Sequence, residues 1–209
     1  TLATESSPMF FEKLGMHKAA AAVEKAIVPV VLFGVLLSIL HQSSLGAVYL
    51  LTPSKLSPLW FNVQLPTMFL VSAIMMGLSM VSFETIVSGK SFNHKPDMAI
   101  LSGLARGVLI TGVIYLALKL YFLMTGPGIG AAFDGSMEAN MLLVEMAVGV
   151  VIPILLLAQR TFREDLNKIF AVNILVIAGI LLNRMNVSLF GVYRSQSATG
   201  FSYFPSLME

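Results

Sequence analysis

The sequence predicts an all-α protein, a polytopic bundle with about five transmembrane helices. Of its 209 residues, 56% are hydrophobic and only 11% are charged, and the mean hydropathy is +0.85. A soluble domain carries about 25% charged residues, so this chain could not cover a globular surface in water, whereas lipid would solvate it. Five apolar stretches are long enough to cross a bilayer, which takes about 20 helical residues.

The first two spans are each followed by a segment whose composition disfavours a helix. The first is predicted near Ala22–Ser44 and the second near Asn62–Ser88. Between the two spans, Thr52–Pro58 contains two prolines. After the second span, Gly89–Pro96 is polar and ends in proline. Proline lacks a backbone donor and clashes with the preceding helical turn, so both segments are expected to be loops.

Three further spans complete the chain. They are predicted near Asp97–Met124, where the aspartate is suited to cap the helix, near Ala139–Gln159 and near Lys168–Phe190. Gly126–Gly135 is rich in glycine and Arg160–Asn167 is charged, as expected of connections. We expect a single transmembrane domain over residues 1–209 that is truncated at both ends.

The distribution of lysine and arginine predicts the orientation of the spans, because cytoplasmic flanks carry an excess of these residues. Placing the start of the chain in the cytoplasm leaves two such residues in the outer loops, Lys55 and Arg194. Lys119, at the outer end of the third span, is expected to extend its ammonium group to water. The inner flanks then hold eight: Lys13, Lys18, Lys25, Lys90, Lys95, Arg160, Arg163 and Lys168.

Charged and titratable residues inside the spans are the candidate functional residues, because a charge at the bilayer centre costs roughly 2.5–3.5 kcal/mol. His41, Glu145 and Arg184 are expected within roughly 10 Å of the outer boundary, counting about 1.5 Å per helical residue. Glu84 is expected near the inner boundary, with Arg106 roughly 14 Å from that side. The sequence therefore predicts two polar layers.

Each of these residues has a structural and a functional interpretation. The carboxylates and guanidinium groups could be ion pairs that hold the helices together, and His41 could be a packing histidine with a hydrogen bond. Alternatively, a carboxyl group removed from water binds protons more readily and can carry them. An imidazole titrates near neutral pH and can donate to a carbonyl oxygen.

Composition also argues against several functions. The chain has no cysteine, which excludes disulfides and thiolate-held iron–sulfur clusters on it. A net charge of +2 argues against nucleic acid as a partner. His17 and His94 are expected in loops, which leaves His41 as the histidine inside a span. We therefore expect no haem and no metal on this chain.

Several segments, in order, resemble the NrfD/PsrC (polysulfide reductase) family of integral membrane subunits. The closest similarity within it is to the HybB-type membrane anchor of uptake hydrogenases, of which this chain would be the C-terminal portion. The segments that carry the resemblance are HQSSLGAVYLL (His41–Leu51), KLSPLW (Lys55–Trp60), SAIMMGLSMVSFE (Ser72–Glu84), LLNRMNVS (Leu181–Ser188) and YFPSLME (Tyr203–Glu209).

The resemblance implies a fragment of an eight-to-ten-helix subunit in a prokaryotic cytoplasmic (inner) membrane. Such subunits are not catalytic alone. They bind a quinone, either menaquinone or ubiquinone, and a ferredoxin-like iron–sulfur subunit docks on their outer face. A catalytic hydrogenase, molybdopterin or multihaem cytochrome subunit lies beyond it. The family's N-terminal helices, which supply important quinone-pocket residues, precede the part represented here.

These considerations lead to a functional hypothesis with two alternatives. The chain is expected to exchange electrons between the external iron–sulfur subunit and quinone, with proton uptake along buried polar residues. Glu84 and Arg106 would admit protons; His41, Glu145 and Arg184 would form the outer, quinone-binding layer. Alternatively, the chain is a passive anchor of such a complex, or a segment of a secondary transporter, which also accounts for buried charges.

Overall fold

The computed structural model describes residues 11, 16–51, 55–93, 96–127 and 129–191, and all regular secondary structure in them is helical. Five helical segments are long and apolar enough to span a membrane, so the predicted polytopic helix bundle is confirmed. The segment Tyr203–Glu209 and the charged residues Lys13, Lys95 and Arg194 lie outside the described residues.

The first spanning helix, α2 (His17–Val48), is continued by the short 3-10 turn η1 (Tyr49–Leu51). It starts earlier than predicted and runs through Pro29 without a break. The second helix, α3 (Leu65–Ser91), has a proline in its first turn, where a missing donor costs nothing. The predicted start at Asn62 was therefore too early.

The third helix, α4 (Met98–Thr125), begins as predicted at Asp97, whose carboxylate accepts from the backbone N–H of Ala99 at 2.7 Å. The glycine-rich connection after it contains a short 3-10 helix, η2 (Ile129–Phe133). Within this segment, buried Ala132 packs against the neighbouring helices and helps to close this end of the bundle.

The fourth span is composite. It comprises α5 (Met137–Met146), a π-helical turn η3 (Ala147–Val151) and α6 (Ile152–Ala158). Pro153 would clash with the carbonyl four residues before it in a regular α-helix. The wider turn directly before it relieves that clash, and the N–H of Ile152 bonds the carbonyl of Ala147.

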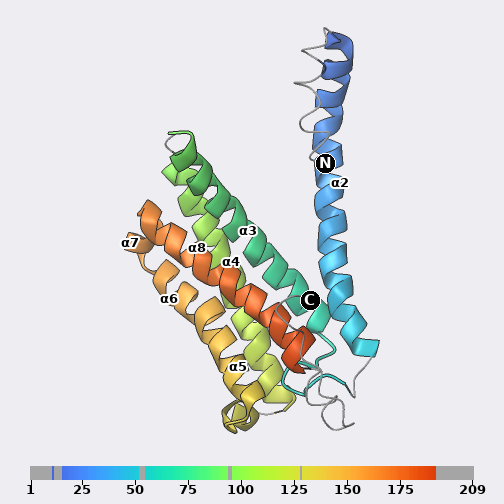
Figure 1. Cartoon of the computed structure of the whole chain (residues 1–209), viewed down its shortest axis with the longest axis vertical. Coiled ribbons are helices and arrows are strands. Elements are labelled where there is room, and N and C mark those ends of the chain that lie inside the picture. The colour runs from blue at the N-terminus through green and yellow to red at the C-terminus, as the bar shows by residue number, and fades with distance from the viewer. Residues whose placement is uncertain (1–10, 12–15, 52–54, 94–95, 128, 192–209) are drawn as a thin grey trace, which may run out of the picture.

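The last span is α8 (Leu166–Met185), followed by a second π-helical turn, η4 (Asn186–Phe190). Its start is capped by Asp165, which accepts from two backbone N–H groups of the first turn. The short helix α7 (Arg160–Arg163) occupies the charged connection before it. Figure 1 shows this connection at the same end of the bundle as the end of α3.

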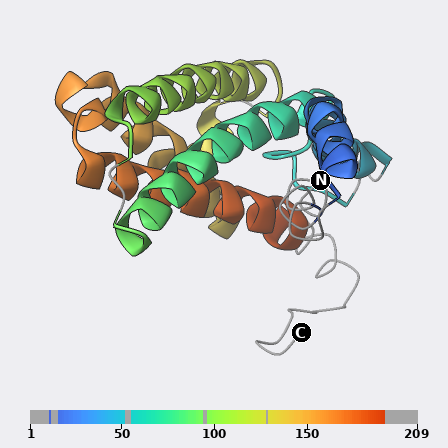
Figure 2. The same ribbon diagram turned by 90° about the horizontal axis from the view of Figure 1, so that it is seen from above.

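Helices α3, α4, α5–α6 and α8 pack together, and α2 stands apart from them (Figures 1 and 2). The bundle core contains large buried residues from all four, such as Met75, Val108, Leu157 and Val176. Helix α2 approaches α3 closely at its C-terminal end, where a Cβ on Gly46 would lie 2.8 Å from the Cα of Pro66. Further along, the two helices diverge.

Because of this divergence, the apolar side chains along the middle of α2 are not covered by the other described residues. Leu32, Phe33, Leu36 and Leu40 are between 56% and 64% exposed. Apolar surface of this extent would be unfavourable in water but is suited to lipid or to another membrane helix. The shape also leaves space between α2 and the bundle, and that space borders the candidate site.

Candidate functional site

Glu145 is the centre of a buried hydrogen-bond network at the end of α5. Its side chain is 2% exposed. Asn183 Nδ2 donates to Oε1 at 2.8 Å, and Asn186 Nδ2 donates to Oε2 at 2.6 Å. The indole N–H of Trp60 also points at Oε2, at 3.4 Å. Three donors from two parts of the chain therefore surround one carboxylate, as a buried negative charge requires.

Lys119 of α4 supplies the opposite charge. Its Nζ lies 3.8 Å from Oε1 of Glu145, and the side chain is only 3% exposed. The expectation that this lysine extends to water was wrong, because Leu56–Trp60 and Ala132 cover this end of the bundle. A buried ion pair is held at the expense of desolvating both ions, so it is weak evidence for a purely stabilising role.

The backbones of the fourth and fifth spans touch directly beside this network. A Cβ on Gly149 would lie 2.7 Å from the Cα of Gly179, so neither position has room for a side chain. Gly149 lies in the π-helical turn one helical turn after Glu145, and Gly179 lies one turn before Asn183. The contact therefore fixes how closely the carboxylate and the amide approach each other.

Arg184 links the network to the space beside α2. Its guanidinium donates to Ser72 Oγ at 2.8 Å and to the carbonyl of Phe69 at 3.1 Å. A longer bond, at 3.4 Å, reaches Oδ1 of Asn183. The guanidinium carbon also lies 3.6 Å from the centre of the Phe69 ring, a cation–π contact. Glu145 and Arg184 are thus joined through one amide side chain.

On the other side of Arg184 lies a groove between α2, α3 and α8, with a cavity volume of about 570 Å³. Ligand sites for small molecules have volumes of about 300–1,000 Å³ and are largely apolar with a few polar groups. This groove has that character. It is lined by Ser38, Gln42, Leu45, Tyr49, Phe69, Ala73, Met76, Gly77, Met80, Leu181, Arg184 and Ser188.

The other predicted residues are not part of this network. His41 is exposed on α2 and does not line the groove, although the adjacent Gln42 does. Glu84 and Arg106 are both exposed, and the structure forms no ion pair between these two side chains. Glu84 borders a separate cavity of about 400 Å³ near the C-terminal end of α3.

Sequence reasoning missed several contributors to the site. Lys119 is a charged residue in a span, so its position alone could have marked it as a partner for Glu145. Asn183 and Asn186 were recognisable as polar residues on one face of the last span. Nothing in the sequence indicated that Trp60 and Ser72 contact charged groups, because those contacts join residues far apart in the chain.

The fold and this site define a multi-pass helical membrane protein with an ion pair buried between its spans. Residues 2–194 match the family described as "Polysulphide reductase, NrfD". The chain belongs to this family, and the resemblance seen in its sequence is confirmed.

Two curated relatives match the whole chain. One, from Nitratidesulfovibrio vulgaris (strain Hildenborough) and named only "Protein", is 34% identical over 226 residues, which cover 55% of the relative. The other is "Probable Ni/Fe-hydrogenase 2 b-type cytochrome subunit" of Escherichia coli (strain K12), 26% identical over 211 residues and 53% of its length. The chain thus spans about half the length of these relatives. No solved structure matches it significantly.

The second relative contradicts the expectation that this chain carries no haem, because it is named as a b-type cytochrome subunit and b-type cytochromes are haem proteins. The residues described here fit a haem only in part. His17 and His41 both lie on α2, on the order of 35 Å apart along its axis, too far to ligate one iron together. His41 offers one axial imidazole; His94 lies outside the described residues.

Proposed function

We propose that the chain is the quinone-reactive part of a membrane subunit in a respiratory oxidoreductase complex of a prokaryotic inner membrane. Electrons would pass between an external iron–sulfur subunit, joined to a catalytic subunit, and membrane quinone. Family membership supports a role in such a complex, as does the hydrogenase named in one relative. Proton uptake along buried polar residues would accompany the electron transfer.

A single observation carries the proposal: an apolar groove has one half-buried guanidinium in its wall, and that guanidinium is linked through Asn183 to a buried acid. A quinone head group is a flat, apolar ring with carbonyl oxygens that accept hydrogen bonds. The groove has the volume for such a ring, and Arg184 and Gln42 offer donors to its oxygens. An isoprenoid tail would lie along the exposed apolar face of α2.

The residues of the site have distinct roles in this proposal. Arg184 would stabilise negative charge that develops on a quinone oxygen as electrons arrive. Reduction to the quinol also takes up protons, for which Glu145 is the buried carboxyl group among the described residues. Lys119 would balance the negative charge of that carboxylate inside the bundle. Electron transfer itself is the chemistry of the quinone and its redox partner.

Replacement of Arg184 by glutamine tests the groove directly. We expect the KM for quinone to rise about tenfold or more, because a hydrogen bond to a charged group contributes about 1.5–3 kcal/mol. The measurement is quinone reduction by the full-length protein in its complex. Photolabelling with an azido-quinone should mark α3 and α8 in the wild type and not in the variant.

Arg160→Gln is the matched control, because Arg160 is 83% exposed and paired only with Glu164. It should change neither the KM nor the labelling. The proposed quinone site in the groove would be refuted by two results together: azido-quinone labelling confined to segments away from the groove, and an unchanged KM for quinone in Arg184→Gln. Unaltered turnover after combined replacement of Arg184 and Glu145 would support a passive anchor instead.

Glu84 remains the proposed point of proton entry, with Arg106 as the second proposed residue of the inner layer. Glu84→Gln is expected to leave assembly intact, because the side chain is exposed and makes no ion pair in the described structure. Turnover with quinone should fall, since glutamine cannot carry a proton. Wild-type turnover in this variant would remove Glu84 from the path.

A transporter would require helices broken near the middle of the membrane. Helix α2 passes through Pro29 intact, and the fourth span widens at its π-helical turn but continues to Ala158. The described spans therefore offer no unwound segment that would favour transport over quinone chemistry.

A further inference from the structure

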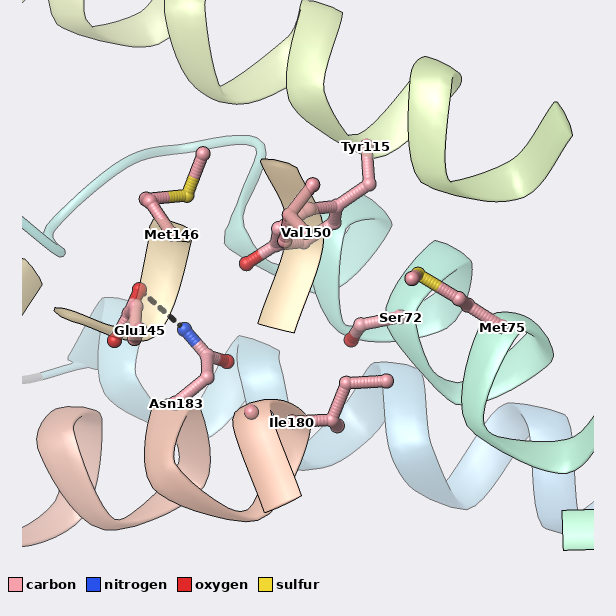
Figure 3. Close-up of a pocket in the computed structure, with 9 residues that line it drawn as sticks. Ser72, Met75, Tyr115, Glu145, Met146, Val150, Ile180 and Asn183 are labelled. Atoms are coloured by element: carbon pink, nitrogen blue, oxygen red, sulfur yellow. Dashed lines mark hydrogen bonds between the residues drawn. The ribbon is translucent and has the colours of Figure 1, made fainter. Parts of the chain in front are cut away.

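A small second cavity lies inside the bundle, next to Glu145. Its volume is about 10 Å³, which is the space that a single water molecule needs. Figure 3 shows the residues around it, with the hydrogen bond from Asn183 to Glu145 on one side. Its polar lining comes from four helices: Ser72 of α3, Tyr115 of α4, Glu145 of α5 and Asn183 of α8. Each of these four side chains is at least nine-tenths buried.

The hydroxyl group of Tyr115 is the feature that points to a ligand. The side chain is 5% exposed, and it forms no hydrogen bond with another residue of the described structure. In Figure 3 its oxygen is directed toward the side on which Glu145 and Asn183 lie. Buried hydroxyl groups are nearly always hydrogen-bonded to protein or to ordered water. A water in the adjoining cavity would satisfy this one.

The direct link between Glu145 and the groove cannot pass a proton by itself. It runs through Asn183, whose nitrogen donates to Glu145 and whose oxygen accepts from Arg184. In an amide these are separate atoms with fixed roles. A hydroxyl group or a water both donates and accepts on one oxygen, so it can hand a proton on. Ser72 lines the small cavity and also contacts Arg184, a residue of the groove wall.

We propose that this cavity binds one water molecule, and that this water and the Tyr115 hydroxyl connect the Glu145 carboxyl group to Ser72, whose Oγ contacts Arg184 of the groove wall. The water has four polar neighbours available and needs two to four. A proton leaving Glu145 would be accepted by the water oxygen, which releases another of its protons toward Ser72 and the groove. The role as a relay depends on the proposed quinone function, whereas the water site does not.

The water site is tested by a high-resolution map of the full-length protein in its complex. We expect one density peak within hydrogen-bond distance of the Tyr115 hydroxyl and a carboxylate oxygen of Glu145. Tyr115→Phe keeps the ring in place and removes the hydroxyl, so the peak should weaken or vanish. A site that is dry in the wild type overturns the proposal, whatever the activity.

The relay is tested by turnover of the same variant. Tyr115→Phe should lower quinone turnover about 100-fold, the lower end of the range for positioned proton transfer, with an unchanged KM for quinone. Tyr121→Phe is the matched control on the same helix, because Tyr121 is 56% exposed; it should behave as the wild type. A retained peak with wild-type turnover in Tyr115→Phe would overturn the relay. If wild-type protein reduces no quinone, the proposed function fails while the density still decides the water site.

Discussion

Replacement of Glu145 by glutamine is expected to abolish turnover with quinone and to destabilise the protein. Glutamine presents an NH₂ group where one carboxylate oxygen stood. In the described structure, the groups that contact the two oxygens are the N–H donors of Trp60, Asn183, Asn186 and Lys119. At least one donor would then face another donor. The ammonium group of Lys119 would also lose its counter-ion while buried. Breaking a buried pair in this way costs about 3–5 kcal/mol.

The loss of activity should exceed what the loss of stability explains. We expect turnover of the folded, detergent-purified complex to fall at least about 100-fold, because a positioned acid or base contributes about that much. Thermal unfolding measures the stability of the same sample. Turnover per folded molecule near the wild-type value would contradict a role for Glu145 in proton transfer.

A double variant separates the two effects. In Glu145→Gln with Lys119→Met, the unpaired charge is gone, and much of the lost stability should return. Activity should not return with it, since no carboxyl group has been restored. Recovery of both would mean that the pair serves only to hold α4 against α5 and α8.

Introduction of a methyl group at Gly179 is expected to have the largest effect on folding. A Cβ there would fall on the backbone of Gly149, and backbone atoms cannot rotate away as a side chain would. Gly179→Ala should therefore separate α8 from the fourth span. We expect a loss of at least about 3 kcal/mol, the upper part of the range for overpacking, and failure to assemble with partner subunits.

Gly103→Ala is the matched control, because a Cβ on Gly103 has nothing within 4 Å. Alanine favours a helix over glycine by about 1 kcal/mol, so this variant should be as stable as the wild type or slightly more so. Amounts of assembled complex in the membrane and the unfolding temperature in detergent compare the two. Equal stability for both variants would show that the contact between Gly149 and Gly179 is not close in the protein.

The spans could be predicted from the sequence because lipid imposes one requirement on all of them. A run of apolar residues has to be helical where no water can bond the backbone, so hydropathy alone locates α3, α4 and α8 to within a few residues. Their internal irregularities could not be predicted in this way. The π-helical turn Ala147–Val151 has an ordinary apolar composition, and Pro153 is its only local signal.

The site could be predicted only in part. Glu145 and Arg184 stood out because charges in spans are costly, and the structure places them in one connected network. Lys119 was misjudged because distance along the helix was taken as depth toward water. The covering of that end by the segment around Trp60 depends on contacts between distant parts of the chain. Proximity of this kind is a property of packing and leaves no periodic signal in the sequence.

The π-helical turn in the fourth span carries one residue more than an α-helix would need for the same path. Each residue of an α-helix turns the chain by about 100°, so removing one between Glu145 and Pro153 would swing the carboxylate to a different side of the helix. A homologue shorter by one residue there would keep a glutamate in its sequence yet aim it elsewhere. Alignments across this stretch therefore need to be anchored separately on the glutamate and on the proline.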